Sequence, residues 1–328
     1  MKRIFKEEGL LSLSGDEAFY YRRENDSLVG CVLTHVDDFF IAGTDQFIES
    51  LTNRIKNNLT ISKIEDDEFR FTGIDIVRSS EGVTVSMEDF AASIGEIEEV
   101  RKGSKTEPLT LMEMKLYRKF TGKVSWLAEN CRPDLCYYAL EMSKRNAKAT
   151  LGDLRKINRI VKKIQGRSSK VFFRSVGTPL DLVVFGIGDA SYKSDDRAIG
   201  GEIVLLGNGY SDRAVPIYWK SKIIRQICHS AKDAETRNLI KLVDTSRFMT
   251  DQLEELLFGK KKNIIPIKLF TDSIPTLESI ASTKQVEQRL LRNCYTELKD
   301  RLEDGDISAF SWLDTDDMVT DLLTKDSK

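Results

Sequence analysis

The sequence predicts a mixed α/β fold whose centre is a five-stranded sheet in the last third of the chain. Residues 182–188, 198–206 and 215–221 are three consecutive apolar segments rich in β-branched residues, which is typical of an antiparallel meander. Residues 231–258 then repeat mainly apolar side chains at alternating spacings of three and four, which predicts a long amphipathic helix. This stripe consists of Leu239, Leu242, Ser246, Met249, Leu253 and Leu256. A sheet flanked by helices accounts for both patterns.

The remaining segments of this region complete the fold. Two further apolar segments predict a fourth and a fifth strand, and three segments of helical spacing surround them. The resulting order is βββαβααβα, with turns at 194–196 and 208–209. The strands are expected over 264–270 and 307–312, and the helices over 273–282, 286–303 and 317–325.

Composition limits the classes of function. The chain has 328 residues, 41% hydrophobic and 31% charged, which is enough for two or three domains with cores of their own. Lys and Arg number 50 against 52 Asp and Glu, so binding of nucleic acid would depend on local basic patches. No apolar run is long enough for a membrane span, and no secretory signal is evident.

Cysteine and histidine usage limits the metal chemistry. The five cysteines are an odd number without the paired spacing of a zinc site, which favours reduced, intracellular thiols. Only His35 and His229 are present, so a histidine-rich metal site is excluded. Any bound metal would have oxygen ligands, which favours a hard cation such as Mg²⁺.

The first hundred residues predict short strands and helices. Residues 1–10 fit a short helix that ends at Gly9, and residues 18–23 and 27–35 fit a β-hairpin. The segments that follow predict a helix, a hairpin of two alternating runs, an acidic helix and a linker. These lie at 44–59, at 68–78 with 83–87, at 88–100, and at 103–108.

Asp37 and Asp38 lie between two strongly β-prone segments. A tight turn explains such residues, because Asp side chains accept hydrogen bonds from their own backbone in turns. Two adjacent aspartates at the tip of a strand-turn-strand unit are also a potential site for a divalent cation. The spacing alone favours the turn.

Residues 111–150 predict two helices on either side of a break at Arg132-Pro133. The tract 144–170 holds ten basic residues against one acid, and its apolar stripe predicts a basic amphipathic helix. This charge would be either a solvated helix face or a surface that contacts phosphates. The stripe consists of Leu154, Ile157, Ile160, Val161 and Ile164.

Four carboxylates in the last third form the candidate site. Asp189 and Asp272 follow apolar strands, and the carboxyl ends of adjacent central strands are where α/β sheets place ligands. The apolar stripe of the long helix, extended back by one step, reaches Glu235, where a carboxylate is costly unless it is paired or bound to metal. Asp321 lies early in the last predicted helix. Each acid alone also fits a turn or helix-start role.

Several motifs resemble copia-type LTR retrotransposon polyproteins, in their C-terminal part. His35-Val36-Asp37-Asp38, followed by Ala42-Gly43, resembles the catalytic-dyad hairpin of their reverse transcriptase. The last third resembles their RNase H domain at five motifs. Together with the dyad hairpin, these motifs extend the likeness along most of the chain. They are Gly188-Asp189-Ala190-Ser191, Trp219-Lys220-Ser221-Lys222, Asp233-Ala234-Glu235, Phe270-Thr271-Asp272-Ser273 and Thr320-Asp321 with Thr324-Lys325.

Three further motifs between these regions support the likeness. Phe71-Thr72-Gly73-Ile74 resembles the hairpin after the palm, and both Leu116-Tyr117-Arg118 and Arg132-Pro133-Asp134 resemble the connecting region. The sequence departs from the family at Thr320, where Ala is usual, and at Lys232-Asp233, where Thr-Glu is usual. These departures leave the four carboxylates in place.

The resemblance implies an RNase H-like five-stranded mixed sheet, preceded by a partial reverse-transcriptase palm and thumb and by a helical connection. The expected extents are 1–107 for the palm and thumb region, 108–178 for the basic connection and 179–328 for the RNase H-like domain. It also favours metal binding at Asp37 and Asp38. The polymerase would still be incomplete, because the family's third aspartate lies on an earlier strand.

The activity implied is Mg²⁺-dependent cleavage of the RNA strand of RNA/DNA hybrids. Asp189, Glu235, Asp272 and Asp321 would hold two Mg²⁺ ions, or Mn²⁺, which activate water and stabilise the leaving oxygen. Phosphate contacts are expected from basic residues on the third strand and on the basic helix. They are Lys220, Lys222, Arg225, Arg155, Arg159, Lys162 and Lys163.

Two alternatives remain open. The chain could be an inactive or co-opted retroelement fragment that binds nucleic acid or retroelement proteins, or it could complete a polymerase together with an upstream reverse-transcriptase segment. The expected partners are an RNA/DNA hybrid and either that segment or a second copy of the chain, with no membrane. The expected location is intracellular, in cytoplasmic retroelement particles or in the nucleus.

Overall fold

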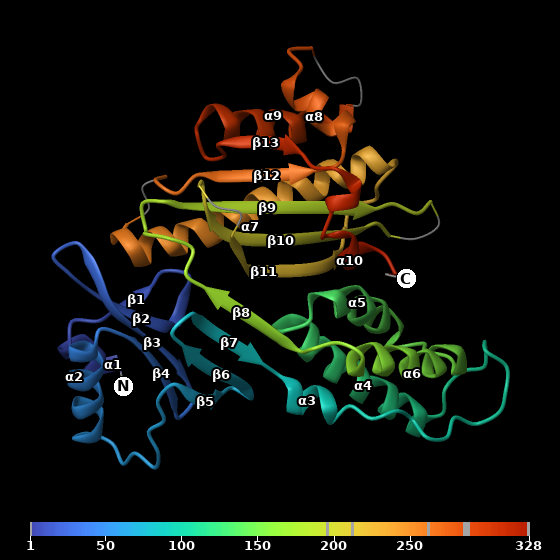
Figure 1. Ribbon diagram of the computed structural model, residues 1–328. Helices are drawn as coiled ribbons and strands as arrows, with labels where there is room; N and C mark the ends of the chain where they lie inside the picture. Colours follow the sequence, from blue (N-terminus) through green and yellow to red (C-terminus); the bar gives the residue numbers. More distant parts are fainter. Residues whose placement is uncertain (1, 195–196, 211–212, 261–262, 285–288, 327–328) are drawn as a thin grey trace.

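The computed structural model describes residues 2–194, 197–210, 213–260, 263–284 and 289–326, arranged as three sheets with helices packed on them (Figure 1). Parts of the predicted turn at 194–196 and the predicted helix start at Val286 lie outside the described residues. None of the helices in the described part of the chain has the length and apolar composition that a membrane crossing requires.

The largest sheet has the strand order β11-β10-β9-β12-β13. Its strands are antiparallel from β9 to β11 and parallel from β9 through β12 to β13. The sequential order βββαβααβα and the five-stranded mixed sheet flanked by helices are those predicted. The strands are β9 (Leu182–Ser191), β10 (Ile199–Asn208), β11 (Ala214–Ile223), β12 (Ile267–Thr271) and β13 (Ala309–Trp312).

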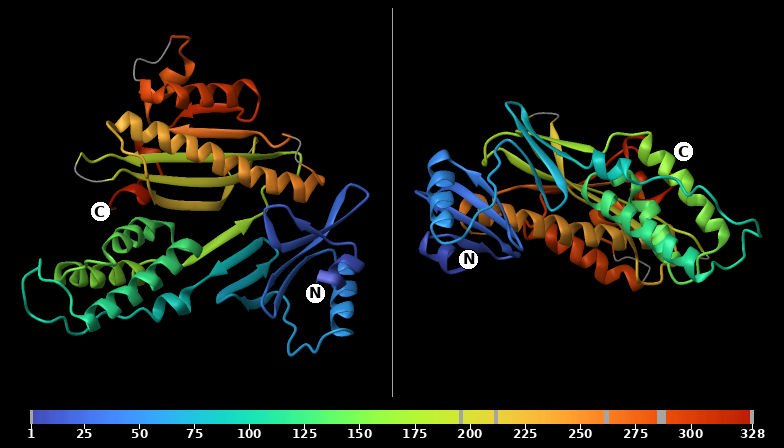
Figure 2. Two further views of the ribbon diagram at one scale, coloured as in Figure 1. Left: turned by 180° about the vertical axis from the view of Figure 1, so that it is seen from behind. Right: turned by 90° about the horizontal axis from the view of Figure 1, so that it is seen from below.

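The helix α7 (Ala231–Phe258) covers one face of this sheet (Figure 2). Its bounds agree with the prediction because both ends carry local signals. The Ser230 side chain accepts a hydrogen bond from the Asp233 N–H at the start, and Gly259 adopts a left-handed conformation at the end. The shorter helices α8 (Ile274–Ala281) and α9 (Arg289–Glu303) pack beside it.

The stripe of α7 differs from the prediction in its second half. Leu239, Leu242 and Ser246 are buried as expected, but Thr250 and Glu254 replace Met249 and Leu253 as buried residues. Glu254 is fully buried and accepts hydrogen bonds from three backbone N–H groups at 263–265. Its burial is therefore explained by the loop that leads into β12.

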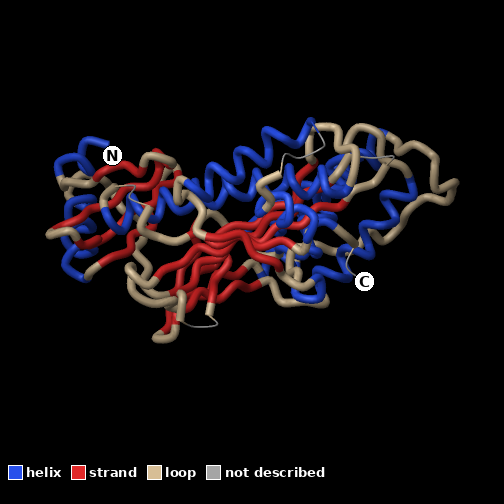
Figure 3. The backbone as a smooth tube through the Cα atoms, turned by 90° about the horizontal axis from the view of Figure 1, so that it is seen from above, coloured by secondary structure: helices blue, strands red, loops and turns tan. Residues whose placement is uncertain are grey.

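The first sheet is antiparallel in the order β1-β2-β3-β4 and includes the predicted hairpin. Its strands are β1 (Leu11–Leu13), β2 (Asp16–Glu24), β3 (Ser27–His35) and β4 (Asp38–Gly43), with α1 (Lys2–Glu7) before them and α2 (Asp45–Lys56) after them. Phe5, Val32, Phe47 and Leu51 form its core. Figure 3 shows these strands at one end of the molecule and the largest sheet in its middle.

The second sheet corrects two predictions. The run 68–78 is two strands rather than one, because Thr72 and Gly73 have positive φ and turn the chain. The tract 144–170 is not one helix: its helix α6 covers only Leu151–Gln165, and its last residue, Lys170, begins the strand β8 (Lys170–Arg174), which pairs with β7. The other strands are β5 (Glu68–Phe71), β6 (Ile74–Ser79) and β7 (Gly82–Ser86).

The helical connection lies on the face of the largest sheet opposite α7. Its helices are α4 (Leu111–Asn130), the 3₁₀ turn η1 (Pro133–Leu135), α5 (Cys136–Arg145) and α6 (Leu151–Gln165). The predicted apolar stripe of α6 is buried in their core, which also includes Ile203 of β10. The Trp219 indole of β11 donates to the Ala128 carbonyl of α4 over 2.8 Å. One apolar core therefore joins the connection to the sheet.

Two predicted helices are much shorter than expected. The helix at 88–100 is only α3 (Glu88–Ala92), because the backbone at Ile97 bonds the Asn158 side chain instead of continuing a helix. The helix at 317–325 is the 3₁₀ turn η2 (Thr315–Asp317) followed by α10 (Asp321–Thr324).

Candidate metal centre at the edge of the largest sheet

Three of the four predicted acids meet at one edge of the sheet. One carboxylate oxygen each of Asp189, Glu235 and Asp272 lies within 4.8 Å of the other two. The strands β9 and β12 run parallel, with Ile187 paired to Phe270, so their ends bring Asp189 and Asp272 together. Glu235, in the first turn of α7, provides the third carboxylate.

Asp189 lies inside β9 rather than after it, paired with Gly201 of β10. Its side chain is 2% exposed. The Thr324 hydroxyl donates to its Oδ2, and the Lys325 Nζ lies 3.6 Å from the same oxygen. Burial raises the pKa of the Asp189 carboxyl, and Thr324 and Lys325 oppose this shift.

Among the acids of the site, Glu235 has the carboxyl whose pKa is shifted most. Burial, followed by the negative charge of Asp189, raises its pKa to about 9. Its Oε1 accepts a hydrogen bond from the Ala190 N–H at 3.1 Å, which favours the charged form. Asp272 is half-buried, and its Oδ2 accepts a hydrogen bond from the Thr315 hydroxyl at 3.1 Å.

Asp321 is not part of this close group among the described residues. It lies in α10, and its Oδ1 is 2.8 Å from the Lys325 Nζ. Lys325 therefore contacts both Asp321 and Asp189. The sequence predicted the four acids, but it did not predict that an ammonium group would lie between two of them.

The structure identifies one further residue at the site that sequence reasoning missed. The Asn238 Nδ2 donates to the carbonyls of Asp189 and Gly201, each at 3.0 Å, and so joins α7 to both strands. Gly200 leaves room for this amide, since a Cβ there would lie 2.1 Å from the Asn238 Oδ1. Asn238 lies beside the predicted apolar stripe rather than on it, so the sequence pattern gave no signal for this residue.

The seven predicted phosphate contacts fall into two groups. Lys220, Arg225, Arg159 and Lys162 are exposed. The other three make contacts inside the protein: Lys222 pairs with the fully buried Glu202, Arg155 donates to the Arg101 and Gly103 carbonyls, and Lys163 donates to the Tyr138 hydroxyl.

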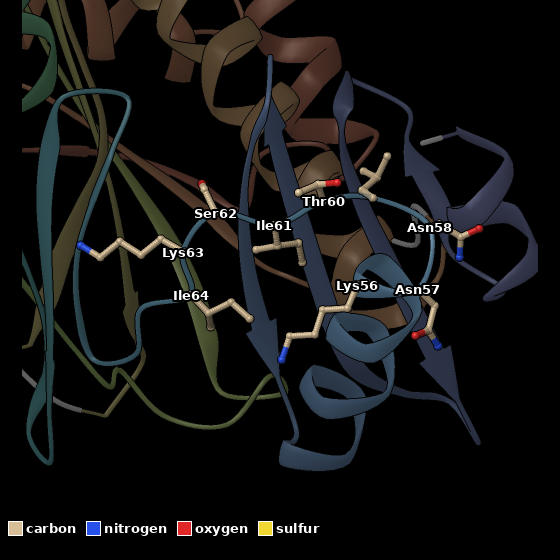
Figure 4. Close-up of a pocket in the computed structure, with 9 residues that line it drawn as sticks. Lys56, Asn57, Asn58, Thr60, Ile61, Ser62, Lys63 and Ile64 are labelled. Atoms are coloured by element: carbon tan, nitrogen blue, oxygen red, sulfur yellow. The ribbon is translucent and has the colours of Figure 1, made fainter.

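Asp37 and Asp38 lie at the exposed tip between β3 and β4, where Val36 has a φ of +53°. Within the described residues, no third acid joins them at ligand distance. A separate open cavity of about 750 Å³ lies beside the loop that follows α2 (Figure 4). It is lined by residues 56–64, none of which belongs to the four acids.

No protein-family model matches the chain, and no curated protein matches it. Several solved structures show similarity to this chain, among them two RNase H1 proteins and one viral protease-reverse transcriptase. RNase H1 from the halophilic archaeon Halobacterium salinarum is 14% identical, with 43% of this chain and 92% of that chain covered and a TM-score of 0.33. LC11-RNase H1 in complex with an RNA/DNA hybrid is 12% identical, with the same coverage and a TM-score of 0.32.

The third structure is the foamy viral protease-reverse transcriptase in complex with an RNA/DNA hybrid. It is 15% identical and has a TM-score of 0.47. The match covers 90% of this chain and 37% of that viral protein.

Proposed function

We propose that this chain is a divalent-metal-dependent nuclease that cleaves the RNA strand of RNA/DNA hybrids. The observation that carries the proposal is the group of three carboxylates from β9, α7 and the end of β12 within 4.8 Å of one another. Burial and the nearby charge of Asp189 raise the pKa of the Glu235 carboxyl, and a bound cation would favour its charged form. An all-oxygen donor set suits Mg²⁺, with Mn²⁺ as a substitute.

Asp189, Glu235 and Asp272 would hold the metal, and Asp321 would approach it from α10. When bound, two such ions supply the activation of water and the stabilisation of the leaving oxygen in phosphodiester hydrolysis. The protein's own contribution is orientation. Thr324 holds the Asp189 carboxylate, the Ala190 N–H holds Glu235, and Thr315 holds Asp272.

The exposed cations Lys220, Arg225, Arg159 and Lys162 are the proposed phosphate contacts. Selectivity for RNA would come from 2′-hydroxyl contacts across the minor groove of the hybrid. Lys222, Arg155 and Lys163 bind partners inside the protein and are therefore proposed to stabilise the fold rather than to contact phosphates.

The proposed context is a copia-type retrotransposon protein. Its regions would be a partial palm and thumb at 1–107, a connection at 108–178 and a nuclease domain at 179–328. Asp37 and Asp38 would be the remnant of a polymerase dyad, and polymerisation would need a further carboxylate, because no third acid lies at ligand distance from them within the described residues.

A panel of labelled duplexes tests the activity. The expected result is Mg²⁺-dependent cutting of the RNA strand in an RNA/DNA hybrid, no cutting of DNA/DNA, and loss of cutting in excess EDTA. The products should carry a 5′ phosphate. Equal cutting of every duplex, or cutting that persists in EDTA, contradicts the proposal.

A further inference from the structure

The helix α10 is too short to hold itself in place. It has four residues, Asp321–Thr324, whereas isolated helices below about 12 residues are marginal in water. It nevertheless carries Asp321 and the Thr324 that bonds Asp189, and Lys325 follows it. Other elements must therefore fix this segment at the edge of the sheet.

Apolar packing against the connection provides part of that support. Leu323 is fully buried and belongs to the same apolar core as the helices α4, α5 and α6. The helix α10 contacts η1 and α5 on one side and β9 and β10 on the other (Figure 1). The Ser221 hydroxyl of β11 donates to the Leu323 carbonyl.

A series of hydrogen bonds provides the remaining support for α10. The Lys163 Nζ of α6 lies 2.6 Å from the Tyr138 hydroxyl and 4.6 Å from the centre of its ring. Lysine can only donate, so the Tyr138 hydroxyl accepts from Lys163 and donates its own proton to the Asp326 carboxylate. Asp326 directly follows Lys325. These hydrogen bonds therefore link Lys163 of the basic helix α6 to Asp326, which lies two residues after Thr324.

We infer that Tyr138 and Lys163 are positioning residues for the metal centre: they anchor the segment after α10 and so set Thr324, Lys325 and Asp321 against Asp189. The inference rests on the proposed function, and it assigns the connection a part in building the site. Lys163 was expected to contact phosphate, and the structure gives it this internal role instead. Charge-assisted hydrogen bonds of this kind are among the stronger polar contacts in proteins.

Tyr138→Phe in the full chain tests the inference, because it removes the hydroxyl and keeps the ring over which Lys163 lies. Tyr137→Phe is the matched control, since the Tyr137 hydroxyl makes no hydrogen bond within the described part of the chain. Asp326→Ala, which removes the acceptor of the Tyr138 hydroxyl, is a second variant. Asp326 is exposed near the end of the chain, so this variant should fold even if Tyr138→Phe does not.

The first readout needs no metal. Backbone hydrogen exchange at 318–326 should be about tenfold faster in Tyr138→Phe and in Asp326→Ala than in the wild type, and unchanged in Tyr137→Phe. Unchanged exchange in both variants overturns the inference, whether or not the protein cleaves hybrids.

The second readout is Mn²⁺ binding measured by electron paramagnetic resonance without substrate. The dissociation constant should rise about fivefold in Tyr138→Phe, less than the roughly 10–100-fold cost of losing a direct partner of a metal ligand. The Mg²⁺ concentration for half-maximal cleavage should rise in parallel, with the rate at saturating Mg²⁺ within about twofold of the wild type. A fall in that saturated rate with unchanged Mn²⁺ affinity contradicts a positioning role. A wild type that binds Mn²⁺ without cleaving hybrids refutes only the proposed function.

Discussion

Replacing Glu235 by glutamine should stabilise the metal-free protein, and the gain should grow with pH. Burial and Asp189 raise the pKa of the Glu235 carboxyl from 4.5 to about 9. A carboxyl with a higher pKa in the folded protein contributes stability that is complete below the unfolded pKa. That stability is lost as the pH rises from about 4.5 toward about 9. Glutamine does not titrate and so avoids this loss.

The size of the effect follows from the shift. Each pKa unit corresponds to about 1.4 kcal/mol, so at a pH of about 7.5 the three units above the ordinary pKa set a ceiling of about 4 kcal/mol. Glu235 is half-buried, and the Ala190 N–H and Lys325 favour its charged form. We therefore expect about 1–2 kcal/mol, or about 1.5–3 °C in melting temperature for a chain of 328 residues.

Thermal unfolding followed by circular dichroism in EDTA measures this gain. Glu235→Gln should melt above the wild type at about pH 8 and close to it at about pH 5. The exposed Glu278→Gln serves as the control and should match the wild type at both values. A Glu235→Gln protein that is no more stable than the wild type at the higher pH refutes the view that this site is strained by its charges.

Three further predictions concern the framework of the site. Arg132→Met should lower the free energy of unfolding in urea by about 3–5 kcal/mol, because the buried Asp134 keeps only the exposed Arg167, 3.7 Å away, as a cationic partner, and the Ile164 and Arg167 carbonyls lose their donor; a loss below about 1 kcal/mol would show that the pair is dispensable. Gly200→Ala should destabilise by about 1–3 kcal/mol through its clash with Asn238, whereas Gly122→Ala in α4, with open space at its Cβ, should be neutral or stabilising in the same melting experiment. Arg23→Ala removes the guanidinium that bonds the Leu256 and Leu257 carbonyls at the end of α7. Hydrogen exchange should rise in that last turn and not at Glu235, and a rise along the whole helix would contradict a local capping role.

The sequence was sufficient to predict the three carboxylates that meet. Asp189 and Asp272 each follow an apolar run, and parallel strands end at the same edge of a sheet. Glu235 lies one helical step before the apolar stripe of α7. These relations are local in the sequence or fixed by the geometry of the fold, and together with the resemblance to RNase H domains they predict the group of acids.

What the sequence could not predict depends on contacts between distant residues. The strand β8 exists because it pairs with β7, which is far away in the chain. Lys222 forms an ion pair with Glu202, and no local sequence pattern predicts that Glu202 is buried. The separation of Asp321 from the other acids follows from the packing of a four-residue helix against the connection.

The most direct test of the central claim compares the wild type with Asp189→Asn on a labelled RNA/DNA hybrid in Mg²⁺. Asparagine keeps the shape of the side chain but removes the charge at the centre of the acid group. The account predicts cutting of the RNA strand by the wild type and a loss of at least about 100-fold in the variant, with its melting temperature maintained. A wild type without activity, or a variant that retains it, would contradict the account.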